Sequence, residues 1–379
     1  MLPDAPIFLA QQTYRGRAHN RLGPVGKACV SDSRQVPGVL LDFGAVHLRG
    51  IEEDASKRSP LSPMVTGCSG YGIETKQNVP MAPWIQRSAP STKTEWDSTI
   101  RESIEQQRKL GVDAIVTPGA ELTSGAYPNG LSRQIDAVRR AWLKRPQDDL
   151  PWLAEVYVHD DWIVDQSMRR FALNVITDLP DDIGVCLHVR FAKRDAAYNA
   201  PSLEPLRDMV EVLADDGRKV LVMQSGIVGW LSIAWGAWGF SAGMSQGSWL
   251  DHRTIIRRRA GAPSPPRVER YFEPQLLHSV LAADHNRFTG ANGYVKCECA
   301  FCKSLTQAAN WDHTAAAQHD LYALAGLTEK VKGVDRAARR NAVRTTIETA
   351  QNTWAQWKAI AGLSNRAEPT ELSVWRGLV

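Results

Sequence analysis

Three cysteines crowd into one short stretch of this chain as Cys297, Cys299 and Cys302, and His319 follows after sixteen intervening residues. Thiolate and imidazole ligands together favour Zn²⁺, and four protein ligands leave no open position for a water molecule. The cluster therefore predicts a structural zinc site, which would oblige residues 297–319 to fold around one point. The alternative is three reduced, buried cysteines that lie together by chance, although the chain has only six cysteines in all.

The fourth zinc ligand has two candidates. His319 begins the apolar run His-Asp-Leu-Tyr-Ala-Leu, which predicts a helix whose first turn can face the cysteines. His313 lies in the less regular segment Trp-Asp-His at 311–313. Ligand spacing favours His319.

Length and composition predict a soluble protein. A chain of 379 residues, 43% of them hydrophobic, can bury one large domain with an appendage or two ordinary domains. It has no apolar run of about eighteen residues, and its N-terminus lacks the pattern of a signal peptide. Cys29, Cys68 and Cys186 show no pairing pattern, as expected in a reducing compartment. These features predict a cytoplasmic protein with no membrane partner.

β-rich runs alternate with amphipathic stretches through most of the chain, which is typical of βα units and a parallel sheet. Strands are predicted at 39–44, 112–116, 152–158, 184–189, 219–223 and 238–242. Helices are predicted at 95–110, 131–143, 162–176, 203–214 and 227–234. A first strand at 6–12 and one more between 45 and 95 would bring the number of strands to eight.

Eight such units predict an α/β fold of the TIM-type (β/α)8 barrel over residues 1–270. A zinc-binding subdomain over 271–330 and a helical segment over 331–379 would follow the barrel. A doubly wound open sheet is the alternative, but no Gly-x-Gly-x-x-Gly motif follows the first strands. In a barrel, functional side chains lie at the C-terminal ends of the strands. The polar residues predicted at those ends are Asp42, Glu121, Glu155, His159, Asp160, His188, Arg190, Gln224, Ser225, Ser241 and Ser245.

A barrel followed by Cys-x-Cys-x-x-Cys and a histidine at the head of a helix resembles the tRNA-guanine transglycosylase superfamily, including its branch that places 7-deazaguanines in DNA. The cysteine cluster is the specific part of this resemblance. Residues 40–45, Leu-Leu-Asp-Phe-Gly-Ala, are similar to the family's strand-end Asp-Ser-Gly-Gly or Asp-Ser-Gly-Ala segment. Residues 223–226 lie where the family's penultimate strand has a Gly-Val-Gly turn, and residues 270–274, Arg-Tyr-Phe-Glu-Pro, resemble the DNA-modifying branch. The resemblance covers residues 38–330 in architecture and about 30 positions around the cysteines in residue identity.

The resemblance implies base exchange at a nucleic-acid glycosidic bond, with a 7-deazaguanine replacing guanine in tRNA or DNA. In relatives, an Asp on the last strand attacks the anomeric carbon, and a second Asp, matched here by Asp42, handles protons. Such carboxylates can stabilise an oxocarbenium-like centre and form a covalent sugar intermediate. The residues expected to bind the base are Glu121, His188, Arg190, Gln224 and Ser241.

The last predicted strand departs from the family pattern. Ser241 stands where the resemblance would put the nucleophilic Asp, and the next carboxylate along the chain is Asp251. An unactivated hydroxyl is a poor substitute for a carboxylate. Either Asp251 reaches back over the mouth of the barrel and acts with Asp42, or the site has lost or changed its chemistry. Asp42 also has a structural alternative, as an N-cap or turn residue.

Other candidates have structural alternatives too. His188 and Arg190 alternate on one strand face, so they either bind substrate or are a buried histidine and an arginine paired with Glu155. Four tryptophans could stack a flipped base, but such residues more often pack a core. They are Trp230, Trp235, Trp238 and Trp249.

The formal net charge of +4 is too small to establish a nucleic-acid partner. Local basic patches that could meet phosphates occur at Arg257–Arg259 and, on a predicted helix, at Arg336, Arg339, Arg340 and Arg344; a solvated surface is the alternative. The expected partners are nucleic acid and a purine or 7-deazapurine base, and both a homodimer and a heteromer are compatible with the sequence.

Three functions remain open at this point. The first is base exchange on tRNA or DNA. The second is a non-catalytic nucleic-acid-binding relative that lacks the nucleophile. The third is an unrelated barrel enzyme whose zinc only braces the C-terminal part.

Overall fold

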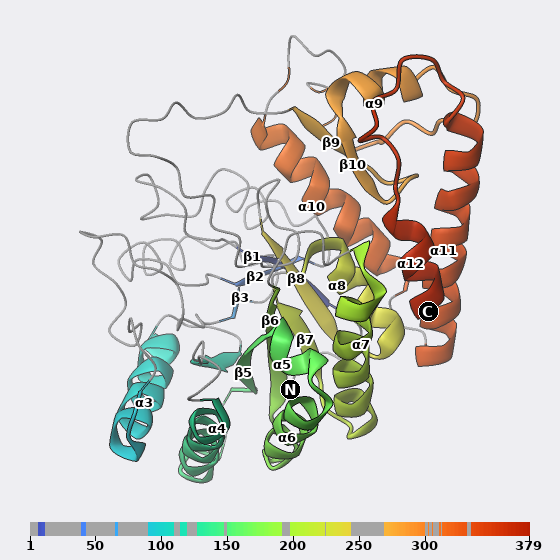
Figure 1. Cartoon of the computed structure of the whole chain (residues 1–379). Coiled ribbons are helices and arrows are strands. Elements are labelled where there is room, and N and C mark those ends of the chain that lie inside the picture. The colour runs from blue at the N-terminus through green and yellow to red at the C-terminus, as the bar shows by residue number, and fades with distance from the viewer. Residues whose placement is uncertain are drawn as a thin grey trace, which may run out of the picture.

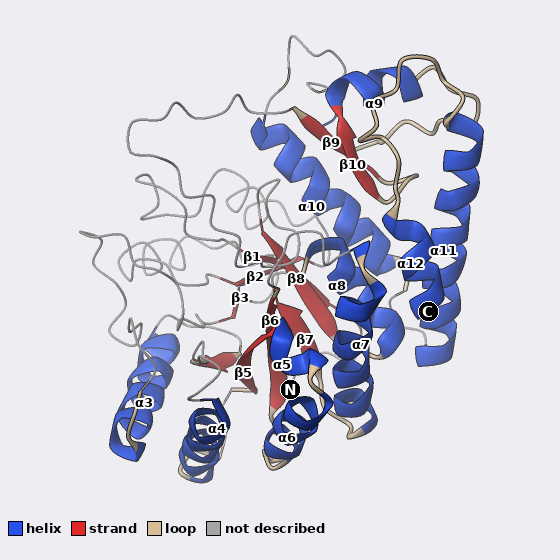
Figure 2. Ribbon diagram, in the orientation of Figure 1, coloured by secondary structure: helices blue, strands red, loops and turns tan. Residues whose placement is uncertain are grey.

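A parallel sheet lies at the centre of the protein (Figure 1, Figure 2). The computed structural model describes residues 7–11, 39–42, 65–66, 90–109, 114–119, 127–147, 150–191, 198–223, 225–243, 269–299, 302, 305, 311, 313–331 and 335–379. The sheet has eight strands: β1 (Ile7–Gln11), β2 (Val39–Asp42), β3 (Val65–Thr66), β4 (Ile115–Thr117), β5 (Trp152–His159), β6 (Gly184–Arg190), β7 (Val220–Met223) and β8 (Gly239–Gly243). The predicted strands are thus confirmed, including the one expected between residues 45 and 95.

The strand order in the sheet is β3-β2-β1-β8-β7-β6-β5-β4. The first strand lies between the second and the last, because Leu9 is in register with both Leu40 and Ser241. The two edges of the sheet therefore belong to β3 and β4, which are consecutive in the chain. Within the described residues, no strand pairing joins these two edges.

Helices cover the outer face of the sheet in chain order. Neighbouring contacts link α3 to α4, α4 to α6, and α6 to α7; in Figure 1, α3, α4 and α6 lie in a row below the strands and α7 stands to the right of β7. Their bounds are α3 (Lys93–Lys109), α4 (Tyr127–Leu143), α6 (Gln166–Thr177) and α7 (Ala200–Asp215). Shorter helical segments follow β5 and β7, namely α5 (Asp160–Val164), α8 (Gly226–Ser232) and η2 (Ile233–Trp235).

Side chains of the strands alternate between two apolar clusters. Val156 and Val158 of β5 pack in the large cluster with the covering helices, whereas Leu153 packs in a smaller cluster on the other face with Cys186 and Leu221. Alternation of this kind follows from the two-residue period of a strand. Since both faces are covered, the strands are apolar almost throughout, as in other parallel sheets.

The helix predicted at 162–176 is two helices in the structure. Asp165 separates them, with its backbone extended and its Oδ1 accepting hydrogen bonds from the N–H groups of Ser167 (2.8 Å) and Met168 (3.0 Å). An aspartate in this position caps the N-terminus of the second helix. The apolar period continues across the break, so periodicity alone could not reveal it.

The C-terminal elements pack beside the sheet (Figure 2). They are an antiparallel hairpin of β9 (Arg270–Glu273) and β10 (His278–Leu281), followed by α9 (Ala282–Phe288), α10 (His313–Glu329), α11 (Arg336–Trp357) and α12 (Glu371–Leu378). Helix α10 contacts β9, β1 and α8. The hairpin is thereby connected to the central sheet. The predicted domain boundaries at 270 and 330 stay predictions.

Two tryptophans attach these helices to the central sheet. The indole Nε1 of Trp230 donates to the carbonyl of Leu327 (3.2 Å), and that of Trp235 donates to the carbonyl of Leu378 (3.0 Å). Both rings are buried, so the suggestion that they stack a flipped base is wrong. Trp238 lies in the smaller apolar cluster, and Trp249 is outside the described residues.

No helix in the described part of the chain is both long and apolar enough to cross a bilayer.

Candidate functional site

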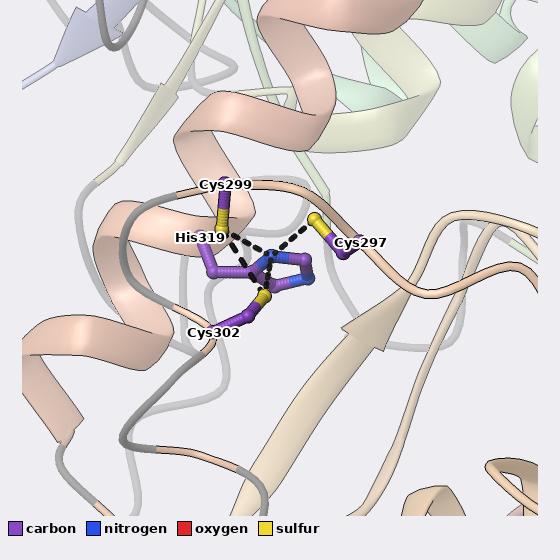
Figure 3. Close-up of side chains that lie close together, drawn as sticks. All are labelled: Cys297, Cys299, Cys302 and His319. Atoms are coloured by element: carbon purple, nitrogen blue, oxygen red, sulfur yellow. Dashed lines mark hydrogen bonds between the residues drawn. The ribbon is translucent and has the colours of Figure 1, made fainter.

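The four predicted metal ligands come together in the structure (Figure 3). The sulfurs of Cys297, Cys299 and Cys302 and Nδ1 of His319 all lie within 4.8 Å of one another. His319 Nδ1 is 3.6, 3.4 and 3.2 Å from the sulfurs of Cys297, Cys299 and Cys302, respectively. Ligand atoms around a tetrahedral zinc ion lie about 3.5–3.8 Å apart. The cluster therefore fits a metal ion with only small adjustment, and its thiolate-rich donor set suits zinc.

The second ring nitrogen of His319 has a partner of its own. Nε2 lies 2.7 Å from the carbonyl oxygen of Phe272 in β9, and a carbonyl can only accept a hydrogen bond. Nε2 therefore carries a proton, and Nδ1 is left to face the three sulfurs. A backbone partner of this kind orients histidine ligands in metal sites.

Tyr271 supports the cluster from one side. Its ring stacks on His319, with centroids 4.2 Å apart, and on His285, with centroids 3.6 Å apart. Its hydroxyl lies 3.4 Å from the sulfur of Cys302. Burial raises the pKa of Tyr271 far above its usual range, so the hydroxyl stays protonated and can donate to a Cys302 thiolate.

Hydrogen bonds join His319 to the three cysteines of the cluster. Burial lowers the pKa of His319, but hydrogen bonds with Cys297 and Cys299 outweigh this effect and raise it to about 10. Hydrogen bonds from Cys299 and Cys302 lower the pKa of Cys297. An imidazolium among thiol groups must lose its proton before Nδ1 can bind a metal, so metal binding would release protons.

A second cluster of polar side chains lies toward the C-terminal ends of β4, β5 and β6. We call the side of the sheet where its strands end the carboxyl edge. Glu155 is buried there, and its Oε2 accepts a hydrogen bond from the N–H of Gly119 (3.0 Å). Its Oε1 lies 3.6 Å from Nδ1 of His188. The sequence offers an Arg190–Glu155 pair as the structural alternative to substrate binding; in the structure, the ion pair of Glu155 is with His188.

His188 lies among aromatic and basic groups. The ring of Tyr157 is 4.1 Å from its ring, centroid to centroid. Two residues further along each strand, His159 is in register with Arg190. The predicted substrate-binding residues His188 and Arg190 are therefore neighbours at the carboxyl edge, together with two rings that the sequence had not marked as substrate-binding. The alternation of residues 155, 157 and 159 along β5 is the signal that could have indicated Tyr157.

Ser241 is buried in the middle of β8, and its hydroxyl lies 3.7 Å from the sulfur of Met223. Its carbonyl accepts a hydrogen bond from the N–H of Ser225 (2.9 Å). The sulfur that the hydroxyl contacts is a thioether, which is not a base that could activate it as a nucleophile.

Asp42 is the last residue of β2 and is in register with Gln11, which in turn is in register with Gly243 of β8. Its backbone thus lies at the carboxyl edge, as a barrel-mouth residue should. Glu121, Gln224 and Asp251 lie outside the described residues, so their predicted roles stay predictions.

The basic residues of α11 are already engaged within the protein. Arg340 bonds to Glu211 of α7 (2.6 Å), Arg336 pairs with Asp215 and Glu211, and Arg344 donates to the carbonyl of Val379. Burial lowers the pKa of Arg339. The expectation that this helix presents a basic patch to phosphates is therefore not supported for Arg336, Arg340 or Arg344. Residues 257–259 lie outside the described part.

Comparison with known proteins adds little to this geometry. No family model matches the chain, and no curated protein matches it. A solved structure from a study of two fungal β-1,4-galactanases is similar with a TM-score of 0.37 and 11% identity, covering 65% of this chain and 97% of the galactanase chain. Likeness at this level carries no argument about function.

Proposed function

We propose that this protein is a base-exchange transglycosylase-like protein that acts on nucleic acid and replaces guanine with a 7-deazaguanine in tRNA or DNA. The observation that carries the proposal is the Cys297–Cys299–Cys302–His319 cluster, bonded through His319 and Phe272 to the strand that follows the central sheet. In this proposal the cluster binds zinc. The zinc is structural, because all four positions are taken by protein ligands.

The proposal also includes closure of the sheet into a (β/α)8 barrel. The order of strands supports it, since β1 pairs with β8 and the two open edges belong to the consecutive strands β3 and β4. A single further pairing between those edges would close the ring. The mouth of that barrel would be the carboxyl edge, where loops of such folds carry the active site.

Residues of the carboxyl edge suit a flat, hydrogen-bonding ligand. Tyr157 offers a ring face, while His188 and Arg190 offer donors that can bond to the oxygen and nitrogen atoms of a purine. Asp42 ends β2 at the same edge and is our candidate for proton handling or purine orientation. Asp251 is the proposed nucleophile, because it is the next carboxylate along the chain after Ser241 and a hydroxyl is a poor substitute for a carboxylate.

The deciding test is transfer of a radiolabelled purine into bulk tRNA and into duplex DNA, run side by side with purified protein. We expect incorporation into one of the two. Asp42→Asn and Asp251→Asn should each reduce it by several orders of magnitude, because the loss of a covalent nucleophile removes a whole reaction path. Zinc content and thermal unfolding of both variants should match the parent protein. Exchange that persists in Asp251→Asn would contradict the assigned nucleophile.

A second candidate is a nucleic-acid-binding relative that performs no exchange. The buried Ser241, whose hydroxyl faces a methionine sulfur at the family's nucleophile position, favours it. Binding of tRNA or DNA that weakens with salt, without incorporation of purine, would establish this function. Binding of neither nucleic acid nor purine would leave an unrelated barrel enzyme.

A further inference from the structure

A groove, which we call the α3–α4 groove, lies between α3 and α4, two helices that run side by side on the helical layer (Figure 1). Its volume is about 410 Å³. The apolar part of its lining includes Ile104, Ala137 and Trp152, all of them buried. Trp152 begins β5 and His159 ends it, so the groove reaches the end of the sheet opposite the carboxyl edge. It is therefore separate from the residues proposed for base exchange.

Positive charge prevails in the α3–α4 groove. Among the described lining residues, the cationic ones are Arg101, Arg108, Arg140, Lys144 and Arg145, and the acidic ones are Asp97 and Glu105. Arg140 is neutralised within the protein, because its Nη2 lies 2.7 Å from Oδ1 of Asp97. The other cations share the described lining with one carboxylate, that of Glu105. The groove thus offers a net positive surface.

Two of these cations have no carboxylate partner among the described residues. Arg101 is exposed, and its guanidinium donates to the hydroxyl of Ser98 (3.4 Å), one turn earlier in α3. It forms no ion pair with Glu105, which follows it by four residues on the same helix. The exposed Nζ of Lys144 makes no bond to any described residue. Ion pairing within the fold therefore does not explain either charge.

Arg145 is held in one orientation beside them. Its guanidinium carbon lies 3.2 Å from the centre of the Trp142 ring, and its Nη1 donates to the carbonyl of Trp142 (3.0 Å). These contacts leave its other N–H groups without a partner in the described part of the chain. A planar guanidinium matches the oxygens of a phosphate group, and a guanidinium fixed on a ring loses little freedom when it binds one.

Helix ends account for only some of these charges. Cations near the C-terminus of a helix stabilise its macrodipole, which is a sufficient reason for Lys144 and Arg145 after α4. The effect is confined to the last turn, however, and Arg101 lies more than two turns before Lys109, the last residue of α3. A charge in mid-helix needs another explanation.

The spacing of the cations favours an extended anion. Arg101 and Arg108 are about 10 Å apart along α3, at about 1.5 Å per residue. Successive phosphates of one strand of a nucleic acid follow each other about every 3.4 Å along the helix axis. Cations spread over this length suit several phosphates of one chain better than a single small anion.

We propose that the α3–α4 groove binds the phosphate backbone of the nucleic-acid substrate through Arg101, Lys144 and Arg145. The inference rests on the proposed function for the identity of the polyanion. Phosphate contacts fix the position of a nucleic acid on a protein without reading its sequence. The groove would therefore hold the substrate at a distance from the carboxyl edge, where the base is exchanged.

The test measures the affinity for tRNA and for duplex DNA as a function of salt concentration. Arg101→Gln and Lys144→Gln should each reduce the slope of log affinity against log salt by about one, and the double variant by about two. The loss should be equal for duplexes of unrelated sequence. Salt at and above about 0.15 M, where the Debye length is about 8 Å, limits the effect of charges that make no contact.

Arg139→Gln is the matched control. Arg139 lies on α4 but does not line the groove, and its Nη1 pairs with Oδ1 of Asp136 (3.6 Å). This variant removes the same charge from the same helix and should keep the parent's slope. A double variant of Arg101 and Lys144 that also keeps the parent's slope would overturn the inference and leave the proposed function intact. A flattened slope in a protein that incorporates no purine would support the groove and contradict base exchange. If the parent protein binds neither tRNA nor duplex DNA, both proposals fail.

Acetylation of lysines by acetic anhydride tests the contact directly. Saturating tRNA or duplex DNA, whichever binds, should protect Lys144, because phosphates would cover its Nζ. Lys358 is exposed at the C-terminal end of α11, outside the groove, and should react equally with and without nucleic acid. Mass spectrometry of peptides measures both lysines in one sample. Acetylation of Lys144 that does not fall when nucleic acid is bound would contradict the proposed contact.

Discussion

His278 bonds through both of its ring nitrogens. Nδ1 lies 2.6 Å from Oε1 of Glu371, and Nε2 lies 3.0 Å from the carbonyl oxygen of Arg366. Both partners are acceptors, so the ring is held as an imidazolium. Burial lowers the pKa of His278, but the bond with Glu371 outweighs this and leaves it raised. The pair joins the β9–β10 hairpin to α12.

We predict that this pair makes stability depend on pH. Because the folded pKa is above the unfolded value of about 6.5, the stabilisation is fully present below that pH and is lost as pH rises through the folded pKa. His278→Gln should reduce the free energy of unfolding by about 3 kcal/mol at low pH and by less at high pH. Urea unfolding of both proteins at several pH values measures the difference. A gap that widens with rising pH would contradict the prediction.

Cys302 is the cysteine of the cluster whose sulfur lies 3.4 Å from the hydroxyl of Tyr271. Cys302→Ser should reduce bound zinc from one ion per chain to well below one, since a hydroxyl is a much weaker zinc ligand than a thiolate. Elemental analysis of protein purified without chelator gives the answer. Cys186→Ala is the matched control, because this buried thiol lies in the apolar interior outside the cluster. Full zinc content in Cys302→Ser would remove the cysteine from the ligand set.

At the scale of single residues, the sequence predicts which residues can bind a metal better than it predicts which side chains pair with each other. Cys297, Cys299, Cys302 and His319 could be found because metal ligands obey short spacing rules. Glu155 could be assigned to the interior by the two-residue period of its strand. Its partner could not be assigned, because residues 188 and 190 alternate onto the same face of their strand, and the two-residue period does not distinguish between them.

Helix α11 is the helix whose predicted role differs most from what the structure shows. Its arginines form a basic stripe in the sequence, yet Arg340 is bonded to Glu211 (2.6 Å) and to the carbonyl of Ala234 (3.3 Å). The sequence does not reveal that Glu211 is a partner of Arg340, because α7 precedes α11 by more than one hundred residues. The charge is neutralised within the fold rather than presented to a polyanion.

Arg340→Ala should therefore affect folding rather than nucleic-acid binding. The pair is half-exposed and screened by solvent, so we expect a loss of about 0.5 kcal/mol in the free energy of unfolding. The slope of log affinity for tRNA or DNA against log salt should not change. A slope reduced by about one would show that Arg340 contacts a phosphate after all. Glu211→Gln serves as the partner control and should destabilise to a similar extent.

The bounds of most elements followed from periodicity and capping residues. Strands β5 to β8 match their predicted ranges to within a residue or two, because short apolar runs bounded by helical segments have few alternatives. The division between α5 and α6 did not follow, because the capping bonds of Asp165 compete with a helical period that continues on both sides. Local hydrogen bonds determine such a break in a helix, and the amino-acid composition of the segment does not indicate them.

For the molecule as a whole, the cluster of Cys297, Cys299, Cys302 and His319 links two sets of elements. His319 belongs to α10, which packs on β1 and α8, while the cysteines follow the β9–β10 hairpin. Structural zinc contributes about 10–16 kcal/mol in small peptides, which is comparable with the stability of an entire domain. Chelation should therefore expose the amides of β9, β10 and the N-terminal half of α10 to hydrogen exchange.

Helices α4, α6 and α7 should stay protected under the same treatment, because their large apolar cluster does not include the metal ligands. Mass spectrometry of deuterium uptake before and after chelation distinguishes the two regions. Equal uptake in both would mean that the zinc supports the entire fold. No change in either would mean that the cluster needs no metal.

The position of β1 between β2 and β8 has a consequence for how the chain folds as it is made. The first strand leaves the ribosome early, but one of its two neighbours is among the last parts of the sheet to be synthesised. Until then β1 presents an unpaired edge, and its contact with α10 is later still. Non-local pairings of this kind slow folding and prolong the exposure of aggregation-prone intermediates. During vectorial synthesis β1 therefore stays without its second neighbour until Gly239–Gly243 has been made, and its edge is open to aggregation during that interval.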